Sequence, residues 1–135
     1  MNFDTKIKII LKNDLEAWQE LNVTAFLISG IAGTQEIIGQ PYKDKSGISY
    51  LPMSQQPIMI HSASGEELKN LLQKAITKDM AISIFTEELF ETYNDEDNRA
   101  SVAGFLTEEL HLAGIGLRGK KNQVDRLLKG VPLHR

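Results

Sequence analysis

The stretch that decides the fold runs from Lys6 to Gly33: Lys6-Ile-Lys-Ile-Ile-Leu-Lys12, the break Asn13-Asp14, and a long apolar segment from Leu15 to about Gly30. In the first part, positions 7, 9 and 11 are apolar and face one way, and Ile10 lies between two lysines on the other face. Apolar residues on both faces favour an inner strand that is covered on both sides. The sequence therefore predicts a buried strand that leads directly into a helix.

The segment that follows the strand has the residues of a helix start, face and end. Asn13 is predicted to cap the helix, with Glu16 completing a capping box three residues later. Glycines at positions 30 and 33 are predicted to end it. The apolar residues at helical spacing form one predicted buried stripe, made of Trp18, Leu21, Ala25 and Ile28.

Asn22 is the unusual residue of this helix, because it falls on the face that is predicted to be buried. A buried amide without partners would cost about 1–3 kcal/mol. One interpretation is a core asparagine that is bonded to a neighbouring loop. The other is that Asn22 lines a cleft at the end of the first strand.

Composition is that of one ordinary globular domain over residues 1–135, with 41% hydrophobic and 24% charged residues. The net charge of −3 does not favour a nucleic-acid binder. The absence of cysteine excludes disulfides and thiolate metal sites. No apolar signal core or membrane-length segment is present, so a cytoplasmic protein is expected, with no membrane contact.

The middle of the chain contains an irregular stretch and then regular elements. Residues 34–56 are broken by glycine and proline, and are expected to form a lid, a binding loop or a subunit contact, or a surface meander with one small hairpin. Residues 57–85 follow as strand, helix and strand, with Ser64 and Glu67 as a capping box and a parallel crossover expected. The predicted inner face of that helix is Leu68, Leu71, Leu72, Ala75 and Ile76.

Residues 86–110 are expected to be helical in two pieces, with a break and a new cap at residues 94–98. Six acids and no base lie in this region: Glu87, Glu88, Glu91, Asp95, Glu96 and Asp97. Their spacing is not that of a calcium loop, so a solvated acidic face is favoured and no metal site or cofactor is predicted.

A last strand is predicted at residues 111–117, followed by a short helix and a basic tail. Gly114-Ile-Gly-Leu-Arg-Gly119 matches a dinucleotide-binding fingerprint, but too few residues follow for the required strand and helix. Paired glycines in a strand instead indicate close backbone approach or a bulge. From Arg118 to the end, the chain has six Lys or Arg residues and one acid, Asp125. Phosphate or RNA is one possible partner of this basic tail, and the acidic segment of the same or another subunit is the alternative.

Short sequence motifs over nearly the whole chain resemble those of an uncharacterised bacterial family, the domain of unknown function two thousand. They are Lys12-Asn-Asp-Leu15, Trp18-Gln19, Leu21-Asn-Val-Thr-Ala-Phe26, Pro41-Tyr-x-Asp44, Asn98-Arg99, Gly114-Ile-Gly116, Val124-Asp125 and Lys129-Gly-x-Pro-Leu-His134.

That family is similar in fold to the class-two peptidyl-tRNA hydrolases. Words that match theirs are Asp14-Leu15, Glu66-Glu-Leu68, Gly114-Ile-Gly116 and Val124-Asp125. The resemblance implies a small, mixed-sheet α/β protein, usually dimeric, that folds without metal and cleaves the ester joining a peptide to tRNA.

The catalytic residues that this resemblance implies carry over poorly. Where the hydrolases have a lysine, a histidine and an aspartate, this chain has Asn22, Ser29 and Glu87. Without the lysine and histidine, a cation for the developing oxyanion and one proton-transfer group are missing. Arg99, Arg118 or Lys120 could replace the cation from another direction.

The sequence predicts a three-layer α/β/α fold with a mixed sheet of four or five strands and helices on both faces. The candidate site is the cleft beyond the first strand, near Asn13, with Asn22, Ser29 and Glu87 as candidate catalytic residues. Further candidate ligand-binding residues are Arg99, Arg118, Lys129 and His134.

Three functions remain open. The first is binding of a small molecule, a tRNA-like ligand or a partner without hydrolase chemistry. The second is an active, metal-independent ester hydrolase with a rebuilt site. The third is a structural homodimer or larger homo-oligomer.

Overall fold

The computed structural model describes residues 3–135 as a mixed α/β fold with one four-stranded sheet and four α-helices. The elements follow in the order β1 (Thr5–Lys12), α1 (Ala17–Thr34), β2 (Tyr42–Lys43), β3 (Ser49–Tyr50), β4 (Ile58–Ala63), α2 (Gly65–Ile76), β5 (Ala81–Thr86), η1 (Glu87–Glu91), α3 (Asp95–Ala103), η2 (Thr107–Glu109), β6 (Leu112–Lys120) and α4 (Lys121–Leu127).

The main sheet has the strand order β4-β1-β6-β5, which places β1 inside the sheet as predicted. β1 pairs in parallel with β4 and antiparallel with β6, and β5 pairs antiparallel with β6. The chain therefore brings the C-terminal ends of β1, β4 and β5 to one edge, where β6 begins. β4 and β5 run in the same direction, as the predicted parallel crossover requires, and they lie at opposite edges of the sheet with β1 and β6 between them.

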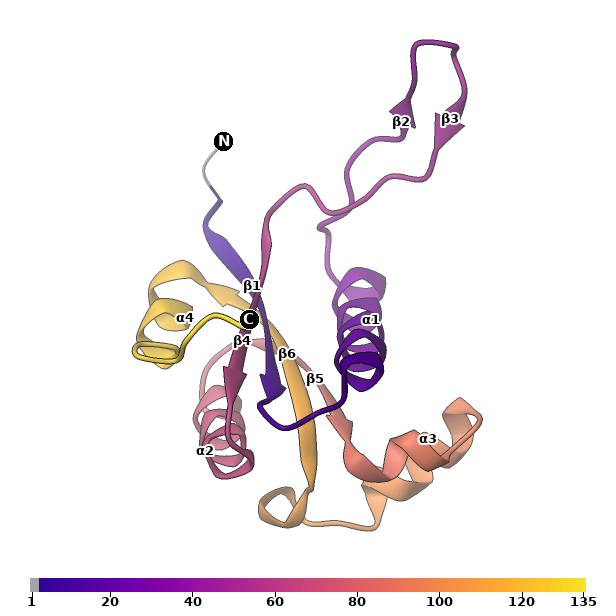
Figure 1. Ribbon diagram of the computed structural model, residues 1–135. Helices are drawn as coiled ribbons and strands as arrows, with labels where there is room; N and C mark the ends of the chain where they lie inside the picture. The colour runs from indigo at the N-terminus through magenta and orange to yellow at the C-terminus, as the bar shows by residue number, and fades with distance from the viewer. Residues whose placement is uncertain (1–2) are drawn as a thin grey trace.

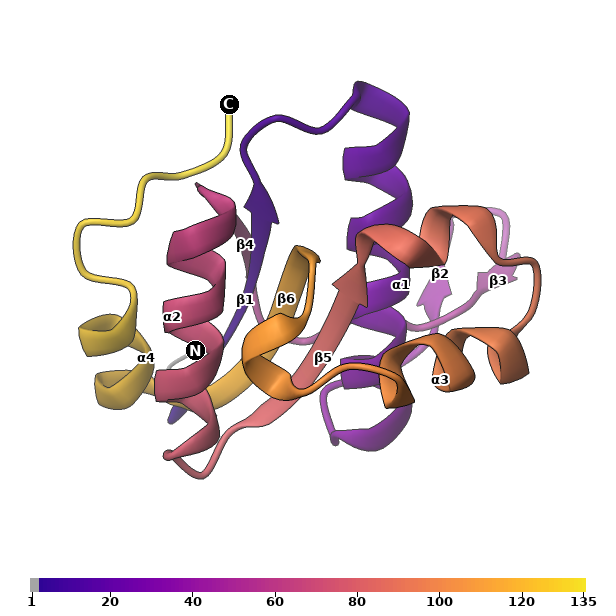
Figure 2. The same cartoon turned by 90° about the horizontal axis from the view of Figure 1, so that it is seen from below.

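Helices cover both faces of the sheet, so the predicted three layers are present (Figure 2). Ile9 and Leu11 of β1 pack with α1 on one face, whereas Ile10 packs with α2 and α4 on the other. Alternation along β1 thus supplies both halves of the core, because successive side chains of a strand point to opposite faces. The predicted division of the strand into two apolar faces is confirmed.

The predictions for α1 were partly wrong. The helix begins after Glu16, whose backbone N–H donates to Gln19 Oε1 at 2.9 Å, so Asn13 is not its cap. It runs through Gly30 and ends at Thr34. Its buried stripe consists of Val23, Leu27 and Ile31, while Trp18, Leu21 and Ala25 of the predicted stripe are exposed. The helix has apolar residues on more than one face, and the periodicity of the sequence led to the wrong face being predicted as the buried one.

The glycines of β6 allow α1 to approach the sheet closely, as their spacing predicted. A Cβ at Gly114 would lie 2.8 Å from Val23 Cγ1 and 3.2 Å from the Ile10 carbonyl oxygen. A Cβ at Gly116 would lie 2.5 Å from Ser83 Oγ and 3.3 Å from Leu27 Cβ. All four distances are shorter than an ordinary contact between carbon atoms, so a side chain at either position would push the helix away.

The later elements follow the sequence predictions with shifted ends. Ser64 caps α2 with Glu67, and the helix buries Leu68, Leu71, Leu72 and Ala75, but Ile76 is exposed. Asn94 caps α3 by accepting a bond from the Asp97 N–H at 2.8 Å. The last strand is longer than predicted, from Leu112 to Lys120, and it contains the whole rejected fingerprint 114–119.

Residues 38–54 form an arm that leaves the body of the molecule at the C-terminal end of α1 (Figure 1). An isolated bridge between Ile38 and Ser54 closes its base, and β2 pairs with β3 near its tip. The small hairpin that was one of the sequence alternatives is therefore present. It projects into solvent and does not lie on the surface of the protein.

We expect Gly114→Ala to lower the free energy of unfolding by about 1–3 kcal/mol, because the added methyl group overpacks the contact between β6 and α1. Urea denaturation measures this change. Gly33→Ala is the matched control: a Cβ there meets nothing within 4 Å, and alanine favours a helix over glycine, so stability should be retained or raised. Equal stability of Gly114→Ala and the unmodified chain would contradict the close-approach interpretation.

Candidate functional site

The outer face of α1 forms one wall of a pocket of about 340 Å³. We call it the aromatic pocket, and its lining residues are Trp18, Asn22, Phe26, Phe85, Leu89, Phe90, Thr92, Tyr93, Asn94, Asp95 and Asn98. They come from α1, the end of β5, η1 and the start of α3. A pocket of this size is in the range that holds small molecules.

Aromatic rings contact one another along this pocket. The Trp18 and Phe90 rings meet edge to face with centroids 5.6 Å apart, and Phe90 lies 5.0 Å from Phe85. Phe85 in turn lies 5.8 Å from Phe26. Such pairs stabilise each other beyond their buried area, so the rings form a firm wall. The Trp18 side chain is nevertheless 59% exposed and presents part of its surface to the pocket and solvent.

Side-chain amides supply the polar part of the lining. Asn94 is occupied in capping α3, and Asn98 bonds to Thr92. Asn22 differs, because within residues 3–135 no hydrogen bond of its half-buried side chain is found. It lines a cleft, as one of the two interpretations proposed, although this cleft lies beside η1 and α3 and not beyond β1. The amide is thus positioned to donate to, and accept from, a bound molecule.

A second recess of about 400 Å³ lies at the edge where the strands end. We call it the strand-end groove, and Lys12, Gly65, Glu66, Lys69, Asn70, Glu87, Leu110, His111 and Leu112 line it. Lys12 Nζ lies 2.6 Å from Glu87 Oε1, and His111 Nδ1 lies 3.1 Å from Glu88 Oε1. The bond to Glu87 raises the pKa of Lys12 above its ordinary value. The groove is therefore polar, and two of its charged residues, Lys12 and Glu87, neutralise each other.

Asn22 and Glu87 were predicted to share one cleft, and this prediction was wrong. Asn22 lines the aromatic pocket, whereas Glu87 lines the strand-end groove and is bonded to Lys12. η1 separates the two recesses: its first residue turns toward Lys12, and its Leu89 and Phe90 turn toward α1.

The remaining predicted site residues are spread over the molecule. Asn13 is exposed and extends the pairing of β1 with β4 through its N–H, and the Ser29 hydroxyl donates to the Phe26 carbonyl within α1. Arg99 pairs with Asp95 on α3, and Lys129 is exposed after α4. None of these four lines the aromatic pocket or the strand-end groove.

The basic residues of β6 are also far from the groove. Arg118 lies opposite Ile7 in the sheet, five residues from Lys12 along β1, which is about 17 Å. Its guanidinium donates to Gln35 Oε1 at 3.1 Å. Lys120 lies opposite Thr5, further still from the groove. Neither residue replaces the missing catalytic cation there.

His134 fastens the C-terminal tail to the body. Its backbone N–H donates to the Ile60 carbonyl at 2.8 Å, which places the tail along the outer side of β4. The ring joins β4 to α1, since Nε2 lies 2.7 Å from Glu20 Oε2 and Nδ1 lies 2.5 Å from Ser62 Oγ. With the ring proton on Nε2, the imidazole donates to Glu20 and accepts from the Ser62 hydroxyl.

Sequence reasoning missed most residues that form the two recesses. Lys12 ends the predicted strand, but its partner Glu87 is 75 positions away and is brought near only by the strand order. Trp18 and Phe26 were noted as helix residues and assigned to the core. Their spacing from Asn22, one turn on either side, was the available signal for a shared outer surface.

A family model of proteins of unknown function, DUF2000, matches residues 5–135 of the chain. The chain belongs to this family. The resemblance drawn from the sequence words is thus confirmed for the family, over nearly the entire length.

A solved structure of another protein of unknown function is closely similar to this family member. It is Atu0240 from Agrobacterium tumefaciens strain C58, with 44% sequence identity and a TM-score of 0.94, and the match covers 99% of this chain and 100% of that one. No curated protein matches the chain. The comparisons thus establish the family and the fold.

Residues 3–135 contain neither a membrane-length apolar helix nor a metal-binding cluster. Within them, no helix combines the length and apolar character needed to cross a membrane. Nor do three or more His, Asp or Glu side chains gather there as a set that could hold a metal ion. The acidic segment 87–97 instead has several of its members in pairs, with Glu87 at Lys12, Glu88 at His111 and Asp95 at Arg99.

His61 makes the stability of the tail contact dependent on pH. Its ring is buried against the tail, with Nδ1 3.0 Å from the Val131 oxygen, and burial lowers the pKa of His61 below its ordinary value of 6.5. As the pH falls, the unfolded chain takes up this proton first. The folded state is therefore fully stabilised above about pH 6.5 and loses this contribution as the pH falls toward the folded pKa.

We expect the free energy of unfolding to fall less between pH 7.5 and pH 5.5 in His61→Gln than in the unmodified chain. Urea denaturation at the two pH values measures the difference. The matched control is His111→Gln, which removes an exposed histidine without touching the tail. An unchanged pH dependence in His61→Gln would show that the buried imidazole is not the titrating group.

Proposed function

We propose that this chain binds a small, flat, polar-edged molecule in the aromatic pocket, on a scaffold related to that of the class-two peptidyl-tRNA hydrolases but without their chemistry. The observation that carries this proposal is the half-buried Asn22 amide, which is placed among aromatic rings with no hydrogen-bond partner found for it within residues 3–135.

The lining of the aromatic pocket defines the chemistry of the ligand. Flat faces of Trp18, Phe90 and Phe26 offer stacking surface, which any planar ring system can use. The Asn22 amide both donates and accepts, so it matches the edge of a heterocycle that carries a carbonyl beside an N–H. A nucleoside-like base has both properties.

The charge of the lining argues against a ligand held by its phosphate. Among the eleven lining residues, all of them described, Lys, Arg and His are absent, and Asp95 is the ionisable acid. Phosphate recognition uses cationic forks or point charges, which this lining lacks, and the nearby Arg99 is already paired with Asp95. The uncharged part of a molecule therefore enters this pocket, and any phosphate would have to remain outside it.

The same lining argues against hydrolysis in this pocket. Asn22 occupies the position at which the resemblance implies a lysine, and an amide neither carries the positive charge that stabilises an oxyanion nor transfers a proton at neutral pH. The Lys12–Glu87 pair retains a cation and a carboxylate, but both face the strand-end groove. The candidate acid and base are thus on the other side of η1 from the stacking surface.

Ester hydrolysis remains a second candidate because of one specific observation. Glu20, His134 and Ser62 form a line of hydrogen bonds in the order of an acid, a base and a nucleophile. Against it, the Ser62 N–H already donates to the Pro132 carbonyl, and Ser62 lines neither recess. A triad also needs oxyanion donors and room for the substrate. These contacts favour a fastening of the tail over a nucleophile.

Fluorescence of Trp18, which is the single tryptophan of the chain, tests binding in the aromatic pocket directly. We expect saturable quenching by at least one of adenosine, guanosine, cytidine and uridine, with no tighter binding of the matching monophosphate. Asn22→Ala should weaken binding about 5- to 160-fold, the effect of losing about 1–3 kcal/mol. Asn70→Ala, in the strand-end groove, is the matched control and should bind normally.

Quenching that is equal in Asn22→Ala and the unmodified chain, or its absence with all four nucleosides, would refute this assignment of the pocket.

The hydrolase candidate has its own test in covalent labelling of Ser62. A fluorophosphonate probe modifies an activated serine hydroxyl, and we expect no labelling because Ser62 serves the tail. Ser62→Ala is the control for labelling at any other site. Stoichiometric labelling that Ser62→Ala abolishes would establish the second candidate instead.

A further inference from the structure

The arm of residues 38–54 is an ordered ribbon and not a loose loop. Between base and tip, the Gly39 N–H donates to the Met53 carbonyl at 2.9 Å, and Tyr42 pairs with Tyr50. At the tip, Asp44 accepts from the backbone of Ser46 and Ile48 and from the Tyr50 hydroxyl. The bond to Tyr50 is the main cause that lowers the pKa of Asp44. The arm is therefore held in its projecting form.

The root of the arm is anchored to the sheet. Ile37 is buried beneath α1 and β1, and the Gln55 N–H donates to its carbonyl at 2.8 Å. The buried Gln56 side chain donates to the Thr5 carbonyl at 2.9 Å. Since the root is fixed and the ribbon is bonded along its length, the direction of the arm is a property of the fold.

Apolar side chains cover this arm although it touches none of the core. Every residue from 41 to 51 is exposed, and Leu51 is exposed by 86%. The other large apolar residues of the arm that are exposed are Ile38, Tyr42, Ile48, Tyr50 and Met53. Such a concentration of exposed apolar surface on one projection is characteristic of a protein contact.

The outer face of α1 is a second apolar surface that residues 3–135 cover only in part, through the contacts of Trp18 with Phe90 and of Phe26 with Phe85. Leu21 is 74% exposed, Trp18 59% and Phe26 54%, and all three lie on the side of the helix that faces away from the sheet. The acidic segment 87–97 borders the same surface, because η1 and the start of α3 line the aromatic pocket together with α1. Acid and apolar surface are thus adjacent.

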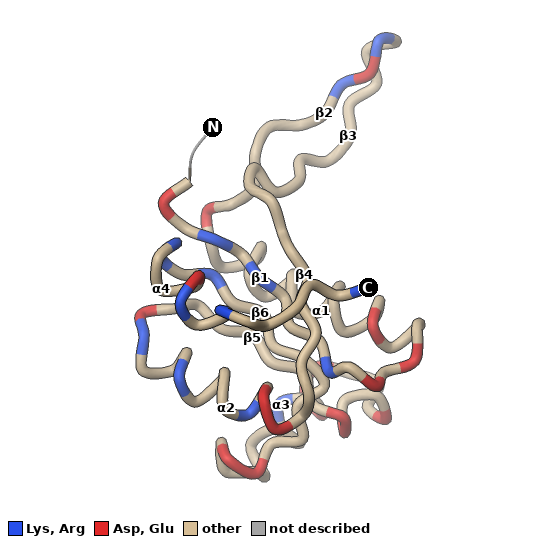
Figure 3. The backbone as a smooth tube through the Cα atoms, turned by 60° about the vertical axis from the view of Figure 1, so that its left-hand side comes forward, with Lys and Arg blue, Asp and Glu red and all other residues tan. Residues whose placement is uncertain are grey.

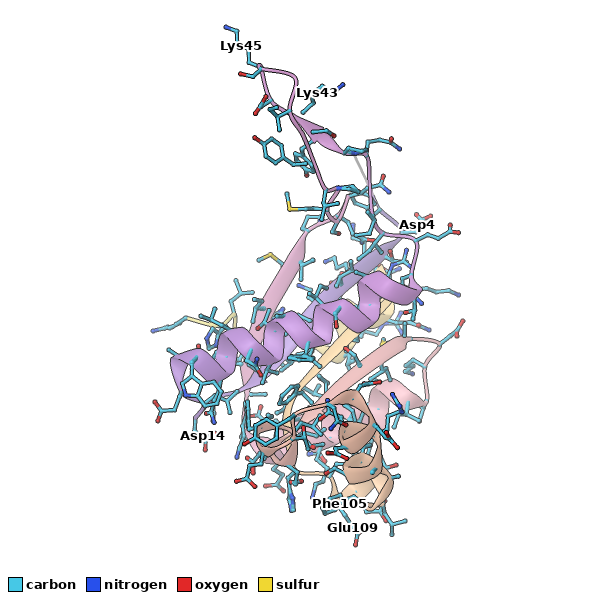
Figure 4. The ribbon with its side chains drawn as sticks, turned by 90° about the vertical axis from the view of Figure 1, so that its right-hand side faces the viewer. Asp4, Asp14, Lys43, Lys45, Phe105 and Glu109 are labelled. Carbon is cyan, nitrogen blue, oxygen red and sulfur yellow. The ribbon has the colours of Figure 1, made fainter. Side chains whose placement is uncertain are left out.

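The arm and this surface match each other in length and charge. From Ile38 to Ser46 the arm spans roughly 30 Å as extended chain, and α1 is about 27 Å long. Lys43 and Lys45 flank Asp44 at the tip, where Figure 3 shows basic and acidic positions side by side, and their side chains point away from the body (Figure 4). No ion pair is found for either lysine within residues 3–135, nor for Glu91 or Glu96 of the acidic segment.

We propose that the arm of one copy packs along the outer face of α1 of a second copy, with its tip lysines at the partner's acidic segment. One chain carries both the donor and the acceptor surface, so a two-fold axis allows the two arms to be exchanged reciprocally. The occupant is a second copy because both the charge and the length of the acceptor surface suit this arm. In the dimer each arm closes the open side of the other copy's aromatic pocket.

Sedimentation of the full chain tests the dimer. We expect a dimer whose dissociation constant rises at least tenfold in Leu51→Asp, because a charge replaces the most exposed apolar side chain of the arm. The matched control is Ile76→Asp, at an exposed apolar residue of α2 on the opposite face of the sheet, and it should remain dimeric. A chain that is monomeric at all concentrations, or a dimer that Leu51→Asp leaves unchanged, overturns the proposal.

Cross-linking tests the position of the arm without relying on stability. The chain has no cysteine, so single variants Lys45→Cys and Glu91→Cys can be mixed and joined with a short bismaleimide. We expect a joined pair of these two variants, and none between Lys45→Cys and Lys78→Cys, which lies beyond the far end of α2. Equal joining to both positions would overturn the proposed placement.

The test is separable from that of the proposed function. The nucleoside titration can be repeated on Leu51→Asp, because its Trp18 and Asn22 are intact. Quenching by a monomeric protein would support the pocket and contradict only the arm's closing role, whereas a dimer without quenching would support the arm alone.

Discussion

The contact on which the fold depends is that between α1 and the bare backbone of β6. Gly114 and Gly116 present no side chains to the helix, so Val23 and Leu27 reach the sheet surface itself. Interiors are packed too densely for another rotation of the helix to be equally good, and this contact selects which face of α1 is buried. Trp18, Asn22 and Phe26 are then left on the outside, where η1 and α3 meet them. The position of the aromatic pocket is a consequence of two missing side chains on a strand.

η1 separates two recesses of different chemical character, the strand-end groove and the aromatic pocket. Its five residues follow directly from β5, and they send Glu87 to the charged groove and Phe90 to the aromatic pocket. On one side, Lys12 and Glu87 neutralise each other at the strand ends; on the other, rings and amides form an uncharged surface. Recognition and proton-transfer groups that a hydrolase would bring together are thus kept apart by a single short helix.

Several features could be predicted because they depend on nearby residues or on alternation along one element. β1 as an inner strand, the Ser64–Glu67 cap, the Asn94 cap and the glycine contact are of this kind. The buried face of α1 could not be chosen, since apolar residues lie on its outer side as well. The mismatch of Asn22 with that face left two interpretations open, a bonded core asparagine and a cleft residue, and the structure places Asn22 in a pocket lining.

Other features depend on which distant segments meet, and local patterns do not contain that information. The Lys12–Glu87 pair requires the strand order, because β6 separates β1 from β5. The same applies to the tail, where His134 reaches Glu20 and Ser62. Composition indicated a long irregular stretch at 34–56. It did not show whether this stretch packs on the body of the protein or projects from it, because that depends on contacts with distant residues.

The insertion of β6 between β1 and β5 has a consequence for biosynthesis. Within the main sheet, β1 and β4 are synthesised first and can pair with each other, but β1 has no neighbour on its other side until residues 112–120 have left the exit tunnel. Until then the nascent chain carries an open, strongly apolar strand edge, which is a template for pairing with other chains. We therefore expect the main sheet to fold cooperatively, and only after β6 has been synthesised. Aggregation is most favoured during synthesis, before β6 pairs with β1 and β5.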